Sequence, residues 1–186
     1  MQVTPTAIPD VLRIEPKVFG DARGFFVETF HEARYAEHGI TARFVQDNVS
    51  LSAEGTLRGL HLQHPRGQGK LVWALTGRVL DVAVDVRVGS PTFGRHVVEV
   101  LDAERKNQLW IPPGFAHGFC VLEGPALFVY KCTDFYSPSD ELTVLWNDPD
   151  LGIDWPIAEP RLSDKDRAGK RLKDIDPRRL PRWSGT

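Results

Sequence analysis

Two histidines, a lysine and a tyrosine on strand-like apolar segments are the residues of this chain best suited to acid/base chemistry. His61 lies in RGLHLQ, His117 in PPGFAHGF and Tyr130 in LFVYK, while Lys70 begins the run that follows His61. A lone histidine of this kind is more often structural. Burying several polar groups without partners, however, costs about 1–3 kcal/mol each. Together these side chains therefore indicate one pocket in which protons are removed and returned.

The same histidines raise the question of a metal site. Segment 111–119, IPPGFAHGF, has the Pro-x-Gly-x-x-His form of a β-barrel fold in which many members bind a metal. The matching segment of such a fold offers His-x-His, but here it reads His61-Leu62-Gln63. Side chains two residues apart lie on the same face of a strand, whereas His61 and His64 are three residues apart and do not share a face. Gln63, which does share the face of His61, is a poor ligand for zinc or iron. The sequence predicts metal-free chemistry, and no metal ligand is assigned.

Short apolar runs punctuated by glycine and proline must position these residues. The clearest run, 70–89, reads as a strand, a turn at Thr76-Gly77 and a second strand with Leu80, Val82, Val84 and Val86 on one face. Further strands are expected at 96–101, 107–111, 117–122, 126–132 and 142–146. Helices are expected only over 31–39 and 163–174. The spacing predicts a mainly β, antiparallel barrel or sandwich of jelly-roll type.

Composition is that of an ordinary globular protein, with 41% hydrophobic and 26% charged residues. One domain over 1–186 is expected, with a proline-rich C-terminal arm from about residue 155. The formal net charge of −2 favours neither nucleic acid nor an anionic membrane as a partner. No 18-residue apolar run or leader-like N-terminus is present, and Cys120 and Cys132 read as buried free thiols, so a cytoplasmic location is expected.

Nine short motifs, in unbroken order from about residue 5 to 170, together resemble the dTDP-4-dehydrorhamnose 3,5-epimerase family of cupin-fold sugar-nucleotide epimerases. Each motif is weak alone, but nine in register are specific. They are D-x-R-G-x-F-x-E (21–28), Q-D-N-x-S (46–50), L-R-G-L-H-x-Q (57–63), Q-x-K-L-V (68–72), G-x-V-x-D-V-x-V-D-x-R (77–87), W-I-P-x-G-F-A-H-G-F (110–119), Y-K-C-T-x-x-Y (130–136), W-N-D-P (146–149) and S-x-K-D (163–166). The resemblance implies a cupin-type antiparallel barrel with a few short peripheral helices.

The resemblance also implies an activity, the conversion of dTDP-4-dehydro-6-deoxy-α-D-glucose to dTDP-4-dehydro-β-L-rhamnose in dTDP-L-rhamnose biosynthesis. The ketone at carbon 4 acidifies the hydrogens at carbons 3 and 5, so neither a redox cofactor nor a metal is required. In the family's pattern His61 is the base, oriented by Asp166, and Tyr130 is the opposing acid. Lys70 would stabilise the enolate oxygen.

Further family contacts are expected to bind the dTDP-sugar. They fall on Arg23, Glu28, Gln46, Asp47, Asn48, Arg58, Lys70, His117, Glu141 and Lys165. Arginine suits the diphosphate because a guanidinium makes paired hydrogen bonds to phosphate. Strand alternation puts Arg58 on the face opposite His61, which leaves open whether it reaches round the rim or acts across a subunit interface. Family members are typically homodimers, and a homodimer is expected.

Three alternatives remain at the level of sequence. The same machinery serves epimerases that invert a single carbon of a related dTDP-4-keto sugar. A metal-dependent cupin is the alternative from another class of enzyme. A non-catalytic sugar-nucleotide binding module is disfavoured, because binding alone needs no base facing an acid.

Overall fold

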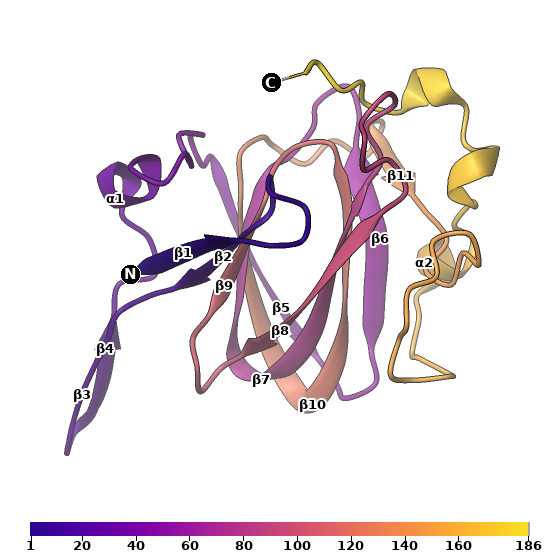
Figure 1. Ribbon diagram of the computed structural model, residues 1–186. Coiled ribbons are helices and arrows are strands. Elements are labelled where there is room, and N and C mark those ends of the chain that lie inside the picture. The colour runs from indigo at the N-terminus through magenta and orange to yellow at the C-terminus, as the bar shows by residue number, and fades with distance from the viewer. Residues whose placement is uncertain (186) are drawn as a thin grey trace.

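Antiparallel strands make up most of the regular structure in the computed structural model, which describes residues 1–185 (Figure 1). The strands are β1 (Gln2–Pro5), β2 (Leu12–Glu15), β3 (Val18–Asp21), β4 (Gly24–Val27), β5 (Gln46–Ser52), β6 (Leu57–Gln63), β7 (Lys70–Asp85), β8 (His96–Asp102), β9 (Gln108–Ile111), β10 (Phe115–Cys132) and β11 (Glu141–Thr143). The helices are α1 (Glu32–Ala36), α2 (Asp164–Arg167) and two 3₁₀ turns, Leu172–Asp174 and Pro177–Arg179. The predicted mainly β barrel with short peripheral helices is confirmed.

Two long, bent strands form the spine of the barrel. β7 and β10 pair along almost their whole lengths, and each contributes one half to each of two facing sheets. One sheet has the order β1-β2-β9-β7-β10-β5, and the other has the order β8-β7-β10-β6-β11. The cavity described below lies between these sheets. Over much of their length the backbones of β7 and β10 are therefore hydrogen-bonded to a strand on each side, which fixes the positions of the side chains that they carry.

The turn expected at Thr76-Gly77 is wrong, because the chain bends there without reversing. Gly77 takes φ +72°, and a Cβ at this position would lie 2.3 Å from the carbonyl oxygen of Glu123. The close approach lets β7 and β10 bend together, which keeps them paired beyond the bend. The expected strands at 117–122 and 126–132 are likewise one strand, β10, with register shifts between Val121 and Phe128.

Three apolar clusters hold the sheets in place. One fills the space between the sheets and includes Val72, Leu109 and Phe128. A second cluster lies on the outer face of the β8-β7-β10-β6-β11 sheet, where Val82 and Val84 pack beneath the C-terminal arm. The third packs α1 against the outer face of the other sheet. Side chains that alternate along the second half of β7 thus face either the space between the sheets or the C-terminal arm, and both faces are buried.

The C-terminal segment crosses the outside of the barrel instead of joining a sheet (Figure 1). The helix predicted over 163–174 is wrong beyond its first turn, since α2 stops at Arg167 and a 3₁₀ turn follows. Gly169 lies against the backbone of Leu145, with its ideal Cβ position 2.9 Å from the Leu145 Cα, and Lys170 forms a β-bridge with Val144. After α2 the chain therefore pairs with a barrel segment through Lys170 and does not continue as a helix. Within residues 1–185 no helix is long and apolar enough to cross a membrane.

Candidate active site

A cavity of about 590 Å³ opens between the two sheets, and its wall carries most of the predicted site residues. Strands β5, β6, β7, β10 and β11 supply its sides, and α2 closes one flank. The predicted residues that line it are Gln46, Asn48, Arg58, His61, Lys70, His117, Tyr130, Glu141, Lys165 and Asp166. Residues that are up to 120 positions apart in the sequence are thus brought into one volume.

His61 and Asp166 form a hydrogen-bonded dyad on this wall. The Nε2 of His61 lies 2.6 Å from Oδ1 of Asp166, whose other oxygen accepts from the Ser163 hydroxyl at 2.7 Å. Burial opposes ionisation of Asp166, but the hydrogen bonds from His61 and Ser163 outweigh it and lower the pKa of this carboxyl. An ionised Asp166 can only accept, so Nε2 carries the proton. The lone pair of His61 is then on Nδ1.

His117 is held by a second carboxylate that the sequence did not single out. Its Nε2 lies 2.8 and 3.0 Å from the two carboxylate oxygens of Asp81, and both side chains are buried. Burial lowers the pKa of His117 despite the opposing charge of Asp81, which favours the neutral imidazole. The only sign of this role in the sequence was the position of Asp81, a charged residue on the inward face of a strand whose side chains alternate. His117 and His61 are cross-strand neighbours in the register of β10 and β6.

Lys70 and Tyr130 carry the remaining titratable groups. Burial lowers the pKa of Lys70, while the negative charges of Asp81 and Glu141 act in the opposite direction. Burial is also the main reason that the pKa of Tyr130 is raised, so its phenol holds its proton at neutral pH. The cavity thus offers a lysine amine, a protonated phenol and an imidazole ring. Those are the groups that proton transfer next to a carbonyl requires.

The face assigned to Arg58 from strand alternation is wrong, because β6 carries a bulge. His61 pairs with His117 and Arg58 with Phe119, so three steps along β6 match two along β10. The extra residue reverses the alternation and turns Arg58 to the cavity, where its Nε donates to Ser52 at 3.0 Å. Arg58 therefore lies in the same cavity as His61, without reaching round the rim.

Only glycine fits at residue 59 in this bulge. Gly59 has φ +129°, and a Cβ would lie 2.5 Å from the Gly118 Cα. We therefore expect Gly59→Ala to lower the free energy of unfolding by about 1–3 kcal/mol or more, because it adds a backbone overlap to an unfavourable φ. Urea unfolding measures this. Gly89→Ala is the matched control, since Gly89 has φ +88° and no described atom lies within 4 Å of its ideal Cβ position. Equal losses in the two variants would contradict the tight bulge.

Three predicted site residues do not line the cavity of their own chain. Arg23 lies at the turn between β3 and β4 and pairs with Asp21, and Glu28 pairs with Arg34. Asp47 points to the opposite side of β5 from Asn48, where Lys131 binds it at 2.8 Å. Their roles in substrate binding stay predictions.

A charged rim lies at the flank of the cavity formed by α2 and β11; it comprises Tyr136, Glu141 and Lys165. The Lys165 ammonium contacts Glu141 at 2.8 Å, and the Tyr136 hydroxyl donates to the same carboxylate at 3.1 Å. Burial raises the pKa of Glu141, but the hydrogen bond and charge of Lys165 prevail and lower it. Sequence reasoning missed Tyr136, for which the only signal was its place in Y-K-C-T-x-x-Y.

Gln63, which replaces a potential metal ligand, has a different use. Its amide nitrogen donates to the carbonyls of Arg66 and Phe135, and its oxygen accepts from the Ser137 N–H at 2.8 Å. The side chain therefore joins two loops beside the cavity. In the part of the chain that the structure describes, no group of three His, Cys, Asp or Glu side chains could hold a metal ion.

Comparison with known proteins places these residues in a family. A family model for dTDP-4-dehydrorhamnose 3,5-epimerase matches residues 5–174. The dTDP-4-dehydrorhamnose 3,5-epimerase of Pseudomonas aeruginosa is 57% identical over 178 residues, which covers 95% of this chain and 98% of that relative. This chain belongs to the dTDP-4-dehydrorhamnose 3,5-epimerase family.

Solved structures of the family agree with the fold. The dTDP-6-deoxy-D-glucose-3,5-epimerase of Legionella pneumophila, in complex with dTDP-4-keto-L-rhamnose, superposes with a TM-score of 0.97 at 54% identity and covers 99% of both chains. ChmJ, a 3'-monoepimerase from Streptomyces bikiniensis in complex with dTDP-quinovose, superposes with a TM-score of 0.89 at 38% identity. The match covers 96% of this chain and 92% of ChmJ. The epimerase family thus contains both double and single epimerases on this fold.

Proposed function

We propose that this protein is a dTDP-4-dehydrorhamnose 3,5-epimerase, which converts dTDP-4-dehydro-6-deoxy-α-D-glucose to dTDP-4-dehydro-β-L-rhamnose in dTDP-L-rhamnose biosynthesis. The observation that carries the proposal is the His61–Asp166 dyad in one cavity with Tyr130 and Lys70, in a chain that is 57% identical to a curated enzyme of this activity. No step of this chemistry needs a redox cofactor or a metal.

The reaction follows from the acidity of hydrogens next to the carbon-4 ketone. Nδ1 of His61 removes the hydrogen from carbon 5 or carbon 3, and Asp166 stabilises the imidazolium that forms. The electron pair of the C–H bond becomes the enolate, whose oxygen is stabilised by the Lys70 ammonium. Tyr130 then donates its phenolic proton to the opposite face of the same carbon, which inverts it. Proton exchange with solvent restores His61 and Tyr130 before the second carbon reacts.

The direct test is to incubate the protein with dTDP-4-dehydro-6-deoxyglucose in deuterated water. Proton NMR should show dTDP-4-dehydro-L-rhamnose with deuterium at carbons 3 and 5. Label and inversion at one carbon alone would replace the proposal by a single-carbon epimerase, the activity of the ChmJ relative. A rate that falls on exhaustive chelation and returns with added metal would instead support a metal-dependent cupin.

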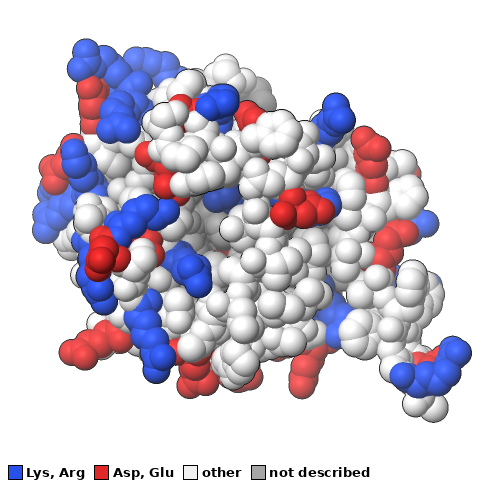
Figure 2. All heavy atoms as spheres, turned by 180° about the vertical axis from the view of Figure 1, so that it is seen from behind, with Lys and Arg blue, Asp and Glu red and all other residues white. Residues whose placement is uncertain are grey.

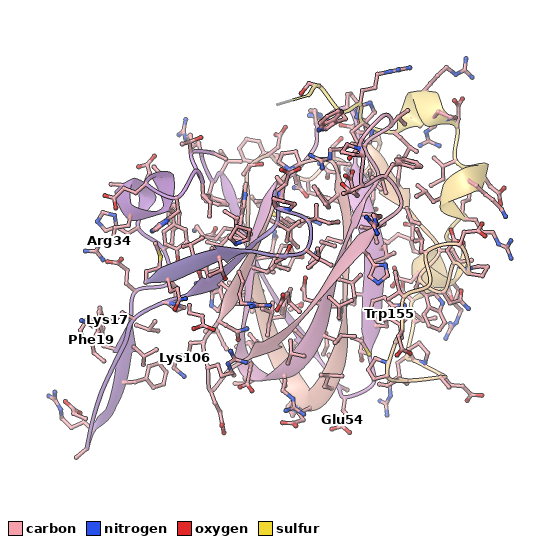
Figure 3. The ribbon with its side chains drawn as sticks, viewed as in Figure 1. Lys17, Phe19, Arg34, Glu54, Lys106 and Trp155 are labelled. Carbon is pink, nitrogen blue, oxygen red and sulfur yellow. The ribbon has the colours of Figure 1, made fainter. Side chains whose placement is uncertain are left out.

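We further propose a homodimer in which each chain completes the cavity of the other. The β3–β4 hairpin projects from the barrel (Figures 1 and 3). Its residues Phe25 and Phe26 are 62% and 68% exposed. Large exposed apolar side chains on one element indicate a protein contact. The same segment carries Arg23 and Glu28, which lie outside the cavity of their own chain.

A second exposed apolar surface lies on the outer face of the barrel. Val49 and Leu51 on β5 and Leu75 on β7 are each more than half exposed. Figure 2 shows that the centre of the rear face of the molecule carries few charged side chains, whereas the projecting hairpin is charged at its tip. An apolar face of this kind suits the apolar part of a hairpin from a second copy, whose charged tip would then reach toward the cavity.

Phe26→Asp tests the dimer. We expect this variant to elute as a monomer in size-exclusion chromatography with light scattering and to bind dTDP more weakly, because a partner no longer supplies Arg23 and Glu28. The matched control is Phe93→Asp, which places the same charge at another exposed phenylalanine. A wild-type protein that is monomeric at micromolar concentration would contradict the dimer without affecting the assignment of the reaction.

We propose that the enzyme works in the cytoplasm, because Cys120 and Cys132 are buried free thiols, as in proteins of a reducing compartment. We propose a single domain because the C-terminal arm buries Leu172 and Ile175 in the cluster that also contains Val82 of the barrel.

A further inference from the structure

One polar atom on the wall of the cavity is buried and lacks a partner. Ser50 shares a face of β5 with Gln46, Asn48 and Ser52. The amide of Gln46 donates to Asn48 at 3.1 Å, and Ser52 accepts from Arg58 at 3.0 Å. The hydroxyl of Ser50 has no hydrogen-bond partner among residues 1–185. It is the exception in an otherwise paired polar row.

The surroundings of Ser50 explain why the protein does not supply that partner. Ser50 lies opposite Phe128 in the register of β5 and β10, and an aromatic ring offers no conventional acceptor or donor there. The Phe128 ring stacks on Phe119 at 4.3 Å and lies 6.3 Å from His117 and 6.2 Å from Tyr130. Ser50 therefore lies at the reacting end of the cavity, away from the charged rim.

A buried hydroxyl without a partner is unfavourable in the free protein, and such groups in native structures call for an explanation. Ser50 lines the cavity, so a bound ligand can pair with it. A serine hydroxyl both donates and accepts, which matches a sugar hydroxyl, whereas a ketone oxygen or a phosphate oxygen only accepts. The apolar rings beside Ser50 also suit a sugar ring better than a diphosphate.

We infer that Ser50 is a substrate-binding residue whose hydroxyl forms a hydrogen bond with a hydroxyl of the bound sugar. The inference rests on the proposed function, since it takes a dTDP-sugar as the ligand. The contact would fix the rotation of the sugar ring against Phe128, and so hold carbons 3 and 5 between His61 and Tyr130. The nucleotide and the diphosphate would not depend on it.

Ser50→Ala tests this inference, because the substitution should lower the affinity for the sugar nucleotide without lowering the stability of the protein. Removal of a buried hydroxyl that has no partner should leave the melting temperature unchanged or raise it. Titration calorimetry should show an affinity for dTDP-glucose, a sugar nucleotide without the ketone, reduced by about 5–30-fold, the loss of one hydrogen bond. The affinity for dTDP itself should be unchanged. Thr4→Ala on β1 is the matched control and should alter neither affinity.

Three results would overturn the inference. They are an unchanged affinity of Ser50→Ala for dTDP-glucose, an equal loss for dTDP, and a melting temperature well below that of Thr4→Ala, which would mean that the hydroxyl is paired in the free protein. Failure of the proposed function looks different, because wild-type protein would then give no labelled product from the 4-keto sugar in deuterated water.

Discussion

Replacing His61 with alanine should abolish the exchange of hydrogen between substrate and solvent. In deuterated water we expect incorporation of label at carbons 3 and 5 to fall by about 10²–10⁴-fold, the usual contribution of a positioned general base. Asp166 does not replace the missing imidazole, because its carboxylate lies behind His61 with one oxygen bound to Ser163. No other group on the wall combines a free lone pair with a carboxylate behind it and the partial solvent access of His61, whose side chain is 23% exposed.

The control is His38→Ala, which removes an exposed imidazole just after α1 and should retain full exchange. Binding of dTDP by His61→Ala should persist, because the nucleotide does not contact the base in the proposed mechanism. Label incorporation close to the wild-type rate would remove His61 from the role of base. His117 would then be the candidate, since it lies beside His61 and has its own carboxylate, Asp81.

Tyr130→Phe should separate exchange from inversion. The variant loses only the phenolic hydroxyl, so His61 can still remove a hydrogen and return a deuteron to the same face of the carbon. We expect label to enter recovered substrate while formation of dTDP-4-dehydro-L-rhamnose falls by about 10²-fold or more. NMR of the mixture distinguishes labelled substrate from labelled product within one experiment.

Tyr35→Phe is the matched control for loss of a phenol. The Tyr35 hydroxyl is also buried, but it donates to Gln108 at 2.7 Å under α1, outside the cavity. This variant should lose stability and keep its turnover number. Normal product formation by Tyr130→Phe would show that another group, or water, delivers the proton.

Sequence patterns predicted the fold and most of the cavity because the relevant strands are locally regular. Alternation holds for His61, His117 and Tyr130, so the side chains expected on one face do meet. The resemblance added Asp166 and Lys165, which lie about a hundred residues beyond His61 in the sequence. The alternation of side chains within a strand does not predict contacts between residues so far apart in the sequence.

The failures occur where backbone contacts between distant segments override local signals. Gly77 reads as a turn, but there it permits a bend against β10. Gly59 permits the bulge that turns Arg58 to the cavity, and the need for that bulge depends on Gly118 of another strand. Gly169 ends α2 because the chain pairs with the segment after β11. A single sequence states that a glycine is present, and only its neighbours in space determine which of its uses applies.

The spine of β7 and β10 has a mechanical consequence for the enzyme. Each of these strands runs through both walls of the cavity, so the walls are covalently continuous and hydrogen-bonded on either side. Hinged closure of one wall on the other would break ladders in both sheets at once. We therefore expect the space between His61 and Tyr130 to keep its width while first one carbon of the sugar and then the other reacts.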